Sequence, residues 1–168
     1  MSPTPDEFRE AVSRFATGIT VVTCVVDGLD HAMTANAFAS VSINPLLVMV
    51  CVERDSRFHE AIATSPTWGV SILAAAAEPT SRWFATKGRP LAGQLERSGH
   101  HRSPRSGVAW IDGALASLEC RTSEIRRAGD HDIVIGEVVE LEILSGEARE
   151  PLLYFRRNYG TLSSGDAS

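Results

Sequence analysis

Short apolar segments rich in β-branched residues recur along almost the whole chain, separated by turn-forming residues. Such segments are typical of β-strands, whereas helices place apolar residues at spacings of three and four. The helical pattern is limited to three short stretches, at 6–16, 55–64 and 78–86. The sequence therefore predicts a mainly β fold with peripheral helices, built as a closed barrel of mainly antiparallel strands.

The first hairpin is predicted most directly. Ile19–Val26 is rich in β-branched residues, and it is followed by Asp27 and Gly28, a pair that tolerates the positive φ angles of a tight turn. The returning strand is expected over 31–41 and ends before an Asn-Pro pair. Leu46–Val52 is a continuous apolar run, which predicts a strand buried on both faces.

The second half of the chain is predicted to be β again after a long connection. The segment 88–107 lacks apolar periodicity and is expected to be a long surface loop. Further strands are predicted at 68–73, 114–125 and 132–144, with a turn at 126–130. We expect an irregular closing segment at 151–159 and a disordered polar tail at 163–168, so that residues 1–162 form one domain.

Charge and composition exclude several classes of function. The chain has 16 lysine and arginine residues against 21 acidic ones, a net charge of −5, which argues against non-specific nucleic-acid binding. The N-terminal residues show no signal-peptide pattern, and the longest strongly apolar run, Leu46–Val52, is far too short to span a membrane. We therefore expect a cytoplasmic protein with no membrane or nucleic-acid partner.

Familiar catalytic and metal-binding patterns are missing from the sequence. There is no GxG triplet, no phosphate loop of the Walker type and no GxSxG elbow. The three cysteines form no CxxC pair, and no two of the five histidines stand three or four residues apart, so no metal site is expected. Chemistry must come from a bound group or from residues that such patterns do not capture.

The segment Thr34–Ser40 is unusual for a strand. If it is one, period-two alternation places Thr34, Asn36, Phe38 and Ser40 on one face and three alanines on the other. Hydroxyls, an amide and one aromatic ring on the first face suit the binding of a flat polar heterocycle. The small alanine side chains on the second face would let a neighbouring segment pack close to the strand. The alternative is a ladder of polar side chains at a solvated rim of the barrel.

Five blocks in a fixed order carry a resemblance to a known family. They are Phe15–Thr23, Thr34–Ser42, Pro45–Cys51, Ala128–His131 and Pro151–Tyr159. With them the sequence resembles the short-chain flavin reductases of two-component monooxygenase systems from about Phe8 to Leu162. This resemblance implies an FMN-binding split β-barrel, that is, a Greek-key antiparallel barrel.

The resemblance also implies a set of flavin-contacting residues. The ring and ribityl chain would lie along one stretch and meet the end of the next strand, at Thr34, Ala35, Asn36, Ala37, Phe38, Ser40, Val41, Ser42, Cys51, Val52 and Glu53. Ser56 and Arg57 begin a predicted helix, whose free N–H groups suit a phosphate, and Lys87 is a second phosphate or diphosphate candidate. The alternatives are an ordinary helix cap for Ser56 and a solvated side chain for Lys87.

A second implied set would bind the nicotinamide nucleotide. His131 would stand beside the flavin and hydrogen-bond the carboxamide, and the alternative is a strand-start histidine bonded to its own turn. Tyr154, Arg156, Arg157 and Tyr159 form an aromatic and cationic cluster, which is otherwise a solvated C-terminal edge. The sequence departs from many relatives at Ala37, where they carry serine, and at Glu53, where they carry aspartate.

The function implied by the resemblance is NAD(P)H:flavin oxidoreductase activity. Hydride would pass from NADH or NADPH to FAD or FMN, and a homodimer would supply reduced flavin to a partner monooxygenase. The alternatives are a non-catalytic split barrel that binds flavin or haem, and an interaction barrel with no cofactor. The sequence leaves open which flavin and which nicotinamide nucleotide are used.

Overall fold

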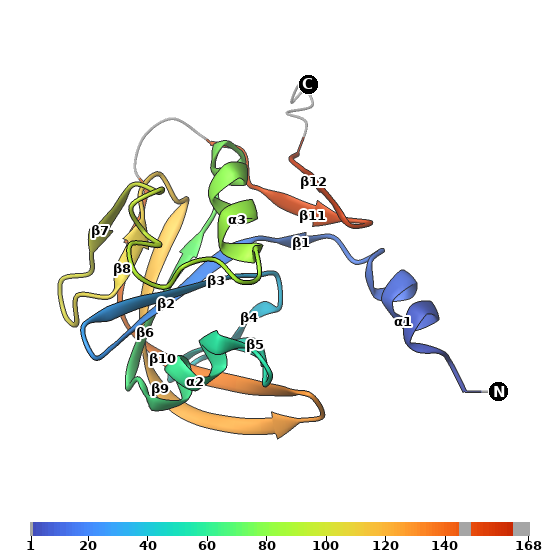
Figure 1. The fold of residues 1–168 in the computed structure, drawn as a ribbon, viewed down its shortest axis with the longest axis horizontal. Coiled ribbons are helices and arrows are strands. Elements are labelled where there is room, and N and C mark those ends of the chain that lie inside the picture. Colours follow the sequence, from blue (N-terminus) through green and yellow to red (C-terminus); the bar gives the residue numbers. More distant parts are fainter. Residues whose placement is uncertain (1, 145–148, 163–168) are drawn as a thin grey trace.

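The fold is organised around one seven-stranded antiparallel sheet (Figure 1). A computed structural model describes residues 2–144 and 149–162, so the tail predicted at 163–168 lies outside the described residues. The strand order in the sheet is β3-β2-β6-β9-β10-β5-β4. These strands are β2 (Thr20–Val26), β3 (Leu29–Ala35), β4 (Phe38–Ile43), β5 (Leu46–Glu53), β6 (Thr67–Ile72), β9 (Ala116–Ala128) and β10 (His131–Ile143).

The predicted mainly β, antiparallel fold is confirmed, although the described strands do not close into a complete barrel. Consecutive strands β3 and β4 form the two opposite edges of the seven-stranded sheet, and no ladder among the described strands joins them. Residues 36 and 37 carry the chain from one edge to the other. The barrel is therefore split at this crossing.

Smaller elements surround the sheet. In the part of the chain that the structure describes, the helices are α1 (Pro5–Val12), α2 (Arg57–Thr64) and α3 (Glu78–Ala85), together with the 3₁₀ turn η1 (Ala75–Ala77). A three-stranded sheet contains β1 (Thr17–Gly18), β11 (Leu153–Phe155) and β12 (Asn158–Gly160), and a two-stranded sheet pairs β7 (His100–Arg102) with β8 (Ala109–Ile111). Helix α2 packs on β2, β3 and β5, and α3 packs on β2 and β3. Among the described residues, no helix is long and apolar enough to cross a membrane.

Two apolar clusters hold these layers together. The first joins the sheet to α2 and includes Trp68, Phe58 and Ile62. The second lies under α3, β8 and the closing segment and includes Phe84 and Leu152. Burial of large apolar side chains is the dominant favourable contribution to folding, at about 1.5–3 kcal/mol for each. Helices α2 and α3 are therefore each anchored in a separate apolar cluster.

Local sequence signals account for several boundaries. Asp27 and Gly28 adopt positive φ angles of 51° and 74°, and β2 and β3 pair directly across this turn as predicted. The hydroxyl of Ser56 caps α2 by accepting a hydrogen bond from the His59 backbone N–H at 3.2 Å. Thr4 and Glu7 form a reciprocal capping box that starts α1.

Tertiary context changes other predicted boundaries. The predicted helix at 6–16 ends at Val12, and Phe15 beyond it is 76% exposed. Strand β5 is not buried on both faces, because buried Val48, Val50 and Val52 alternate with partly or largely exposed neighbours. The turn predicted at 126–130 is confined to 129–130, since β9 continues to Ala128, and the closing segment at 151–159 contains the β11–β12 hairpin rather than irregular chain.

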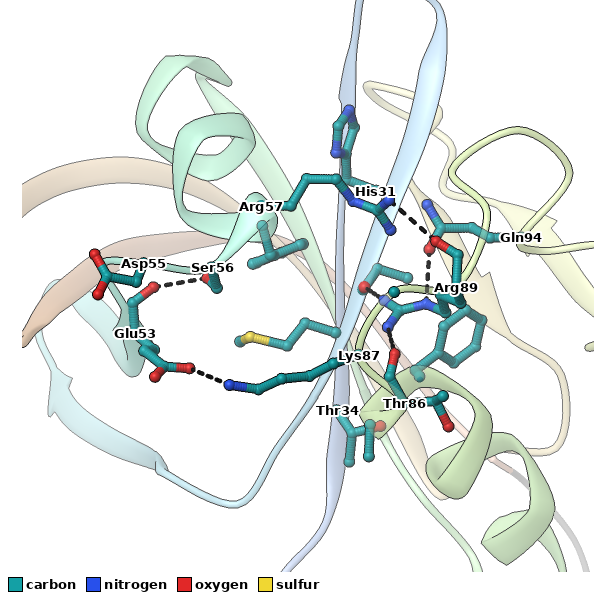
Figure 2. Close-up of a pocket in the computed structure, with 16 residues that line it drawn as sticks. His31, Thr34, Glu53, Asp55, Ser56, Arg57, Thr86, Lys87, Arg89 and Gln94 are labelled. Atoms are coloured by element: carbon teal, nitrogen blue, oxygen red, sulfur yellow. Dashed lines mark hydrogen bonds and ion pairs between the residues drawn. The ribbon is translucent and has the colours of Figure 1, made fainter.

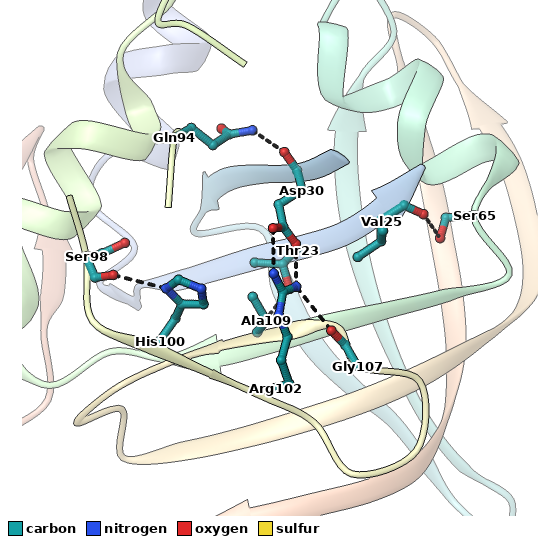
Figure 3. A network of polar contacts seen from close by, with 10 residues as sticks. All are labelled: Thr23, Val25, Asp30, Ser65, Gln94, Ser98, His100, Arg102, Gly107 and Ala109. Carbon is teal, nitrogen blue, oxygen red and sulfur yellow. Dashed lines mark hydrogen bonds and ion pairs between the residues drawn. The ribbon is translucent and has the colours of Figure 1, made fainter. Parts of the chain in front are cut away.

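The segment 88–107 is fixed to the barrel, which the loop prediction did not anticipate (Figure 3). Gln94 is buried and donates from its amide to the Asp30 carbonyl. Arg102 on β7 makes two hydrogen bonds to the Asp30 carboxylate, at 2.6 and 2.7 Å. These bonds tie the segment to the β2–β3 hairpin, so it forms a firm wall beside β3.

The ion pairs of His101 lead us to expect that the free energy of unfolding depends on pH. His101 on β7 contacts Asp112 at 2.7 Å and Glu142 at 3.2 Å, and the hydrogen bond to Asp112, followed by the one to Glu142, raises the pKa of His101 above its ordinary value of 6.5. A raised folded-state pKa gives stability that is complete below pH 6.5 and is lost as pH rises through the folded-state pKa.

We expect the loss to be at most about 1 kcal/mol because the pair is partly exposed. Urea denaturation across this pH range measures it. His101→Gln should flatten the decline, whereas His100→Gln should leave it in place. A decline of the same size in His101→Gln would assign it to another group.

Candidate functional site

The crossing between β3 and β4 shapes the candidate site. Thr34, near the end of β3, donates from its hydroxyl to the Ser81 carbonyl at 2.6 Å, and the Cys51 N–H donates to the Ala37 carbonyl at 3.0 Å. Asn36 and Ala37 form the crossing itself and are exposed. Thr34, Asn36, Phe38 and Ser40 therefore do not share one face of a continuous strand, because the chain leaves β3 before it enters β4.

A cavity of about 470 Å³ opens beside β3, between the start of α2 and the end of α3 (Figure 2). Its volume falls in the usual range of small-molecule sites, about 300–1,000 Å³. We call it the α2 cavity. Sixteen residues line it: His31, Ala32, Met33, Thr34, Glu53, Asp55, Ser56, Arg57, Phe58, Phe84, Ala85, Thr86, Lys87, Gly88, Arg89 and Gln94.

Predicted phosphate ligands meet on the walls of the α2 cavity. Ser56 and Arg57 come from the start of α2, and Lys87 comes from the chain just after α3. Figure 2 shows the Lys87 side chain reaching across towards β5, where its Nζ lies 3.3 Å from the Glu53 carboxylate. Two cationic side chains and a helix N-terminus thus surround one space, an arrangement suited to a phosphate.

Arg89, which sequence reasoning missed, is a structural cation rather than a free one. Its guanidinium donates to the carbonyls of Ala32 and Thr86 and to the Gln94 side chain. Its own carbonyl accepts from Arg57 at 3.1 Å. Burial and the nearby Arg57 charge lower the pKa of Arg89. Arg89 therefore fixes the far wall of the cavity, and a single arginine in a predicted loop gave no sequence signal for this.

A second cavity, of about 520 Å³, adjoins the first on the other side of α3. The two share Thr34, Ala85 and Thr86, so the end of α3 forms their common wall. We call the second one the hairpin cavity because the β11–β12 hairpin lines it. Its lining residues are Ile19, Thr34, Asn36, Arg82, Ala85, Thr86, Tyr154, Arg157 and Tyr159.

The aromatic and cationic cluster predicted near the C-terminus is largely assembled in the hairpin cavity. Tyr154 and Tyr159 pack edge to face at 5.4 Å, and the Tyr159 hydroxyl lies 2.8 Å from the Ser81 hydroxyl. Arg82, which the sequence analysis missed, stacks over the Tyr159 ring at 4.6 Å. Arg157 lines the cavity, whereas Arg156 lies over Phe155 and outside it.

His131 lies outside both cavities of its own chain. It begins β10, opposite Glu53 in the β5–β10 ladder, and its Nδ1 contacts the Asp130 carboxylate at 2.8 Å. This contact matches the alternative of a histidine bonded to its own turn. The Glu53 register nevertheless places His131 one strand away from the mouth of the α2 cavity.

The other predicted flavin-contacting residues lie around the crossing and outside the lining of the α2 cavity. On β4, Phe38 and Ser42 are partly buried, Ser40 and Val41 are exposed, and the ladder is irregular between Ser40 and Ser42. The side chains of Ala35 and Val52 are buried, so these residues could contact a ligand only through their backbone atoms. Cys51 is half-buried beside Ala37.

The described residues offer no nucleophile or metal centre of a familiar kind. Burial raises the pKa of Cys24 and of Cys120 to about 12, and it also raises the pKa of Cys51, so these thiols stay protonated. Within residues 2–144 and 149–162, no group of three His, Cys, Asp or Glu side chains is placed to hold a metal ion. The residues do fit a phosphorylated aromatic ligand, because the α2 cavity combines apolar surface, a capped helix start and two cations.

Comparisons with known proteins agree with this geometry. A family model described as "Flavin reductase like domain" matches residues 12–163. The NADH-dependent FAD reductase of Streptomyces globisporus is 39% identical over 90% of this chain and 84% of its own length. The reductase component of 4-hydroxyphenylacetate 3-monooxygenase from Thermus thermophilus is 37% identical over 94% of this chain and 96% of its own.

A solved structure is similar over the same extent. The Streptomyces globisporus NADH:FAD oxidoreductase, in complex with NAD and FAD fragments, superposes with a TM-score of 0.90 at 33% identity. The match covers 100% of this chain and 99% of that one. The matched region therefore includes the residues that line both cavities and those of the crossing between β3 and β4.

Proposed function

The chain belongs to the flavin reductase family, and from this premise we propose that it is an NADH-dependent oxidoreductase that reduces FAD or FMN. Its reduced flavin then serves a separate monooxygenase; the Thermus relative is named the reductase component of such an enzyme. Within the oxidoreductases we place it among the NAD(P)H:flavin reductases. The observation that carries the proposal is the pair of adjoining cavities, one with phosphate-binding chemistry and one lined by tyrosines and arginines.

The residues act by binding and positioning. When flavin and NADH are bound, they supply the hydride chemistry themselves. Ser56, Arg57 and Lys87 hold the flavin phosphate, and residues 34–42 and 51–53 line the ring and ribityl chain. Tyr154, Arg157 and Tyr159 hold the nicotinamide nucleotide from the hairpin side. This division explains why the described residues need no acid–base pair.

The decisive experiment is anaerobic reduction of added flavin. Purified protein mixed with FAD or FMN and then with NADH should bleach the visible flavin absorbance at a rate proportional to the protein concentration. Flavin binding without bleaching would instead favour a sensor or storage protein, and haem binding would favour the haem alternative. An absence of binding would favour the interaction barrel with no cofactor.

We propose that the protein works as a homodimer, supported by apolar side chains exposed on α1 and just after it. Helix α1 extends away from the sheet (Figure 1) and buries none of its residues. Phe8, Val12 and Phe15 are 63%, 48% and 76% exposed, a surface typical of interfaces rather than of an isolated helix. Sedimentation velocity should give a dimer for the wild type and a monomer for Phe8→Ser/Val12→Ser.

The cytoplasm is the proposed location. NADH is the expected hydride donor, and the free thiols of Cys24, Cys51 and Cys120 fit a reducing compartment. Fractionation of producing cells, with the protein followed by immunoblotting, tests this location.

His131→Ala is expected to raise the KM for NADH about 10-fold while flavin affinity changes less than about 2-fold. The imidazole would contribute one hydrogen bond to the carboxamide, worth about 1–1.5 kcal/mol. Steady-state kinetics with varied NADH, together with a flavin titration, measure both quantities. Equal losses in the two would contradict the nicotinamide role and agree with a structural bond to Asp130.

A further inference from the structure

The hairpin tip that carries His131 has little buried surface of its own. Every residue from Ser123 to Asp130, at the end of β9 and in the turn, is exposed, and His131 is only partly buried. His131 bonds to the Asp130 carboxylate, but that side chain is 94% exposed, and exposed ion pairs are weak. The position of His131 therefore depends on what anchors the residues on either side of it.

Asp132 is the first buried residue after this tip. It lies on the same face of β10 as the buried residues Val134 and Gly136. Its Oδ2 atom lies 2.7 Å from Nε2 of His59, which comes from the first turn of α2. Because α2 is anchored in the first apolar cluster, this bond ties the start of β10 to a fixed helix.

The hydrogen bond between His59 and Asp132 has a defined direction. This bond, followed by the charge of Arg54 at 3.6 Å, lowers the pKa of the Asp132 carboxyl below its ordinary value. An ionised carboxylate only accepts hydrogen bonds, so Nε2 of His59 is the donor. The Oδ1 atom of Asp132 is buried and has no hydrogen-bond partner among the described residues. The orientation of this carboxylate therefore depends on His59.

A backbone bond anchors the other side of His131. The Arg54 N–H, in the short connection between β5 and α2, donates to the Asp130 carbonyl at 3.0 Å. His131 is also the last residue of β10 to pair with β5, opposite Glu53. Asp130 is thus held through its backbone and Asp132 through its side chain, with His131 between them.

Stability alone does not explain a buried charged pair at this place. Apolar residues of similar volume often replace such a pair with no loss of stability or with a gain. A valine in place of Asp132 would continue the apolar face of Val134. A hydrogen bond, in contrast, fixes a distance and an angle, which apolar contact does not. The pair is therefore better explained by the placement of the strand than by its stability.

We propose that His59 and Asp132 are positioning residues that hold His131 in place for the nicotinamide nucleotide. This inference rests on the proposed reductase function and on the nicotinamide role proposed for His131. Neither His59 nor Asp132 lines a cavity, so both act through the start of β10. Because α2 also presents Ser56 and Arg57 to the flavin phosphate, one helix sets the spacing between the two ligands.

The experiment compares His59→Asn with His59→Gln by steady-state kinetics with varied NADH. A glutamine amide can reach the position of Nε2, whereas the shorter asparagine leaves Asp132 without its donor. His59→Asn should raise the KM for NADH about 5-fold, most of the about 10-fold effect expected for His131→Ala. Its kcat and its FMN affinity should stay within about 2-fold of the wild type, because only nucleotide binding is weakened. His59→Gln should keep the KM within about 2-fold.

A double-mutant cycle shows whether His59 acts through His131. In the His131→Ala background, His59→Asn should change the KM for NADH by less than about 1.5-fold, because no imidazole remains to be placed. A purely structural role of His59 would give the same loss in both backgrounds.

The apolar variant His59→Leu/Asp132→Val separates placement from stability. Its urea midpoint should equal or exceed that of the wild type, while its KM for NADH rises as in His59→Asn. It also provides a second folded test should His59→Asn be unstable. His101→Asn is the matched control, because His101 contacts Asp112 at the same distance of 2.7 Å and lies outside both cavities. The KM for NADH should not change in this control.

Each other outcome has a separate meaning. An unchanged KM in His59→Asn and in the apolar variant would overturn the proposal and make the pair a structural contact. Equal losses with and without His131 would overturn it as well. No effect of His131→Ala on the KM would remove both the nicotinamide role and this proposal, while leaving the reductase function intact. Failure of the wild type to reduce flavin would instead reject the reductase function itself.

Discussion

An Arg57→Ala/Lys87→Met variant is expected to bind FMN about 100-fold more weakly than the wild type, with riboflavin affinity changed less than about 3-fold. Both side chains line the α2 cavity. A hydrogen bond to a charged group contributes about 1.5–3 kcal/mol, so the loss of two gives about 3 kcal/mol or more. Riboflavin carries the same ring without the phosphate, so only the phosphate contribution should disappear. Fluorescence titration with the two ligands measures the difference.

Net charge and ionic strength provide the controls for this variant. Arg105→Ala/Arg121→Met removes two exposed cations that do not line either cavity and should leave FMN affinity within about 2-fold. Wild-type FMN binding should weaken with added salt, whereas riboflavin binding should not. If FMN and riboflavin lost affinity equally in the Arg57/Lys87 variant, the phosphate would have to bind elsewhere.

Ser56 shows how two sequence interpretations can both hold. Its hydroxyl caps α2 and also donates to the Glu53 carbonyl at 2.6 Å, so the ordinary structural role is present. The same residue lines the α2 cavity beside Arg57. A helix start was predictable from sequence because capping depends on neighbouring residues only. Ser56 and Lys87 are thirty-one residues apart in the sequence, and they line the same cavity because α3 packs against β3.

The break at residues 36 and 37 could not be predicted from local pattern. Small and polar residues in alternation fit one long strand as well as two short ones. What separates β3 from β4 is their pairing, since β3 pairs with β2 and β4 pairs with β5. Strand partners are set by the whole sheet, so the residue pattern and the family resemblance indicated a special role for this stretch but not the break within it.

The wall formed by residues 88–107 was missed for a related reason. Its anchoring groups are Gln94 and Arg102, and both bind Asp30, more than sixty residues away in the sequence. Polar side chains without periodicity predict a solvated loop, and only the folded hairpin supplies their acceptors. The α2 cavity could therefore be recognised only in the structure, although most of its proposed phosphate-binding residues were predicted from the sequence.

Gly136→Ala is expected to destabilise the fold by about 3 kcal/mol, the upper end of what overpacking costs. Gly136 lies in the middle of β10, where an added Cβ would stand 2.5 Å from Trp68 Cζ2 and 2.9 Å from Cys120 Cβ. Trp68 and Cys120 are fully buried, so neither can move aside without disturbing the core below α2. Gly160→Ala is the matched control, because it is also a strand glycine and has nothing within 4 Å of an added Cβ. Urea denaturation of the two variants should separate them clearly, and equal midpoints would mean that Trp68 shifts freely. Because the strain lies in the core and not in either cavity, the folded fraction of Gly136→Ala should keep wild-type FMN affinity.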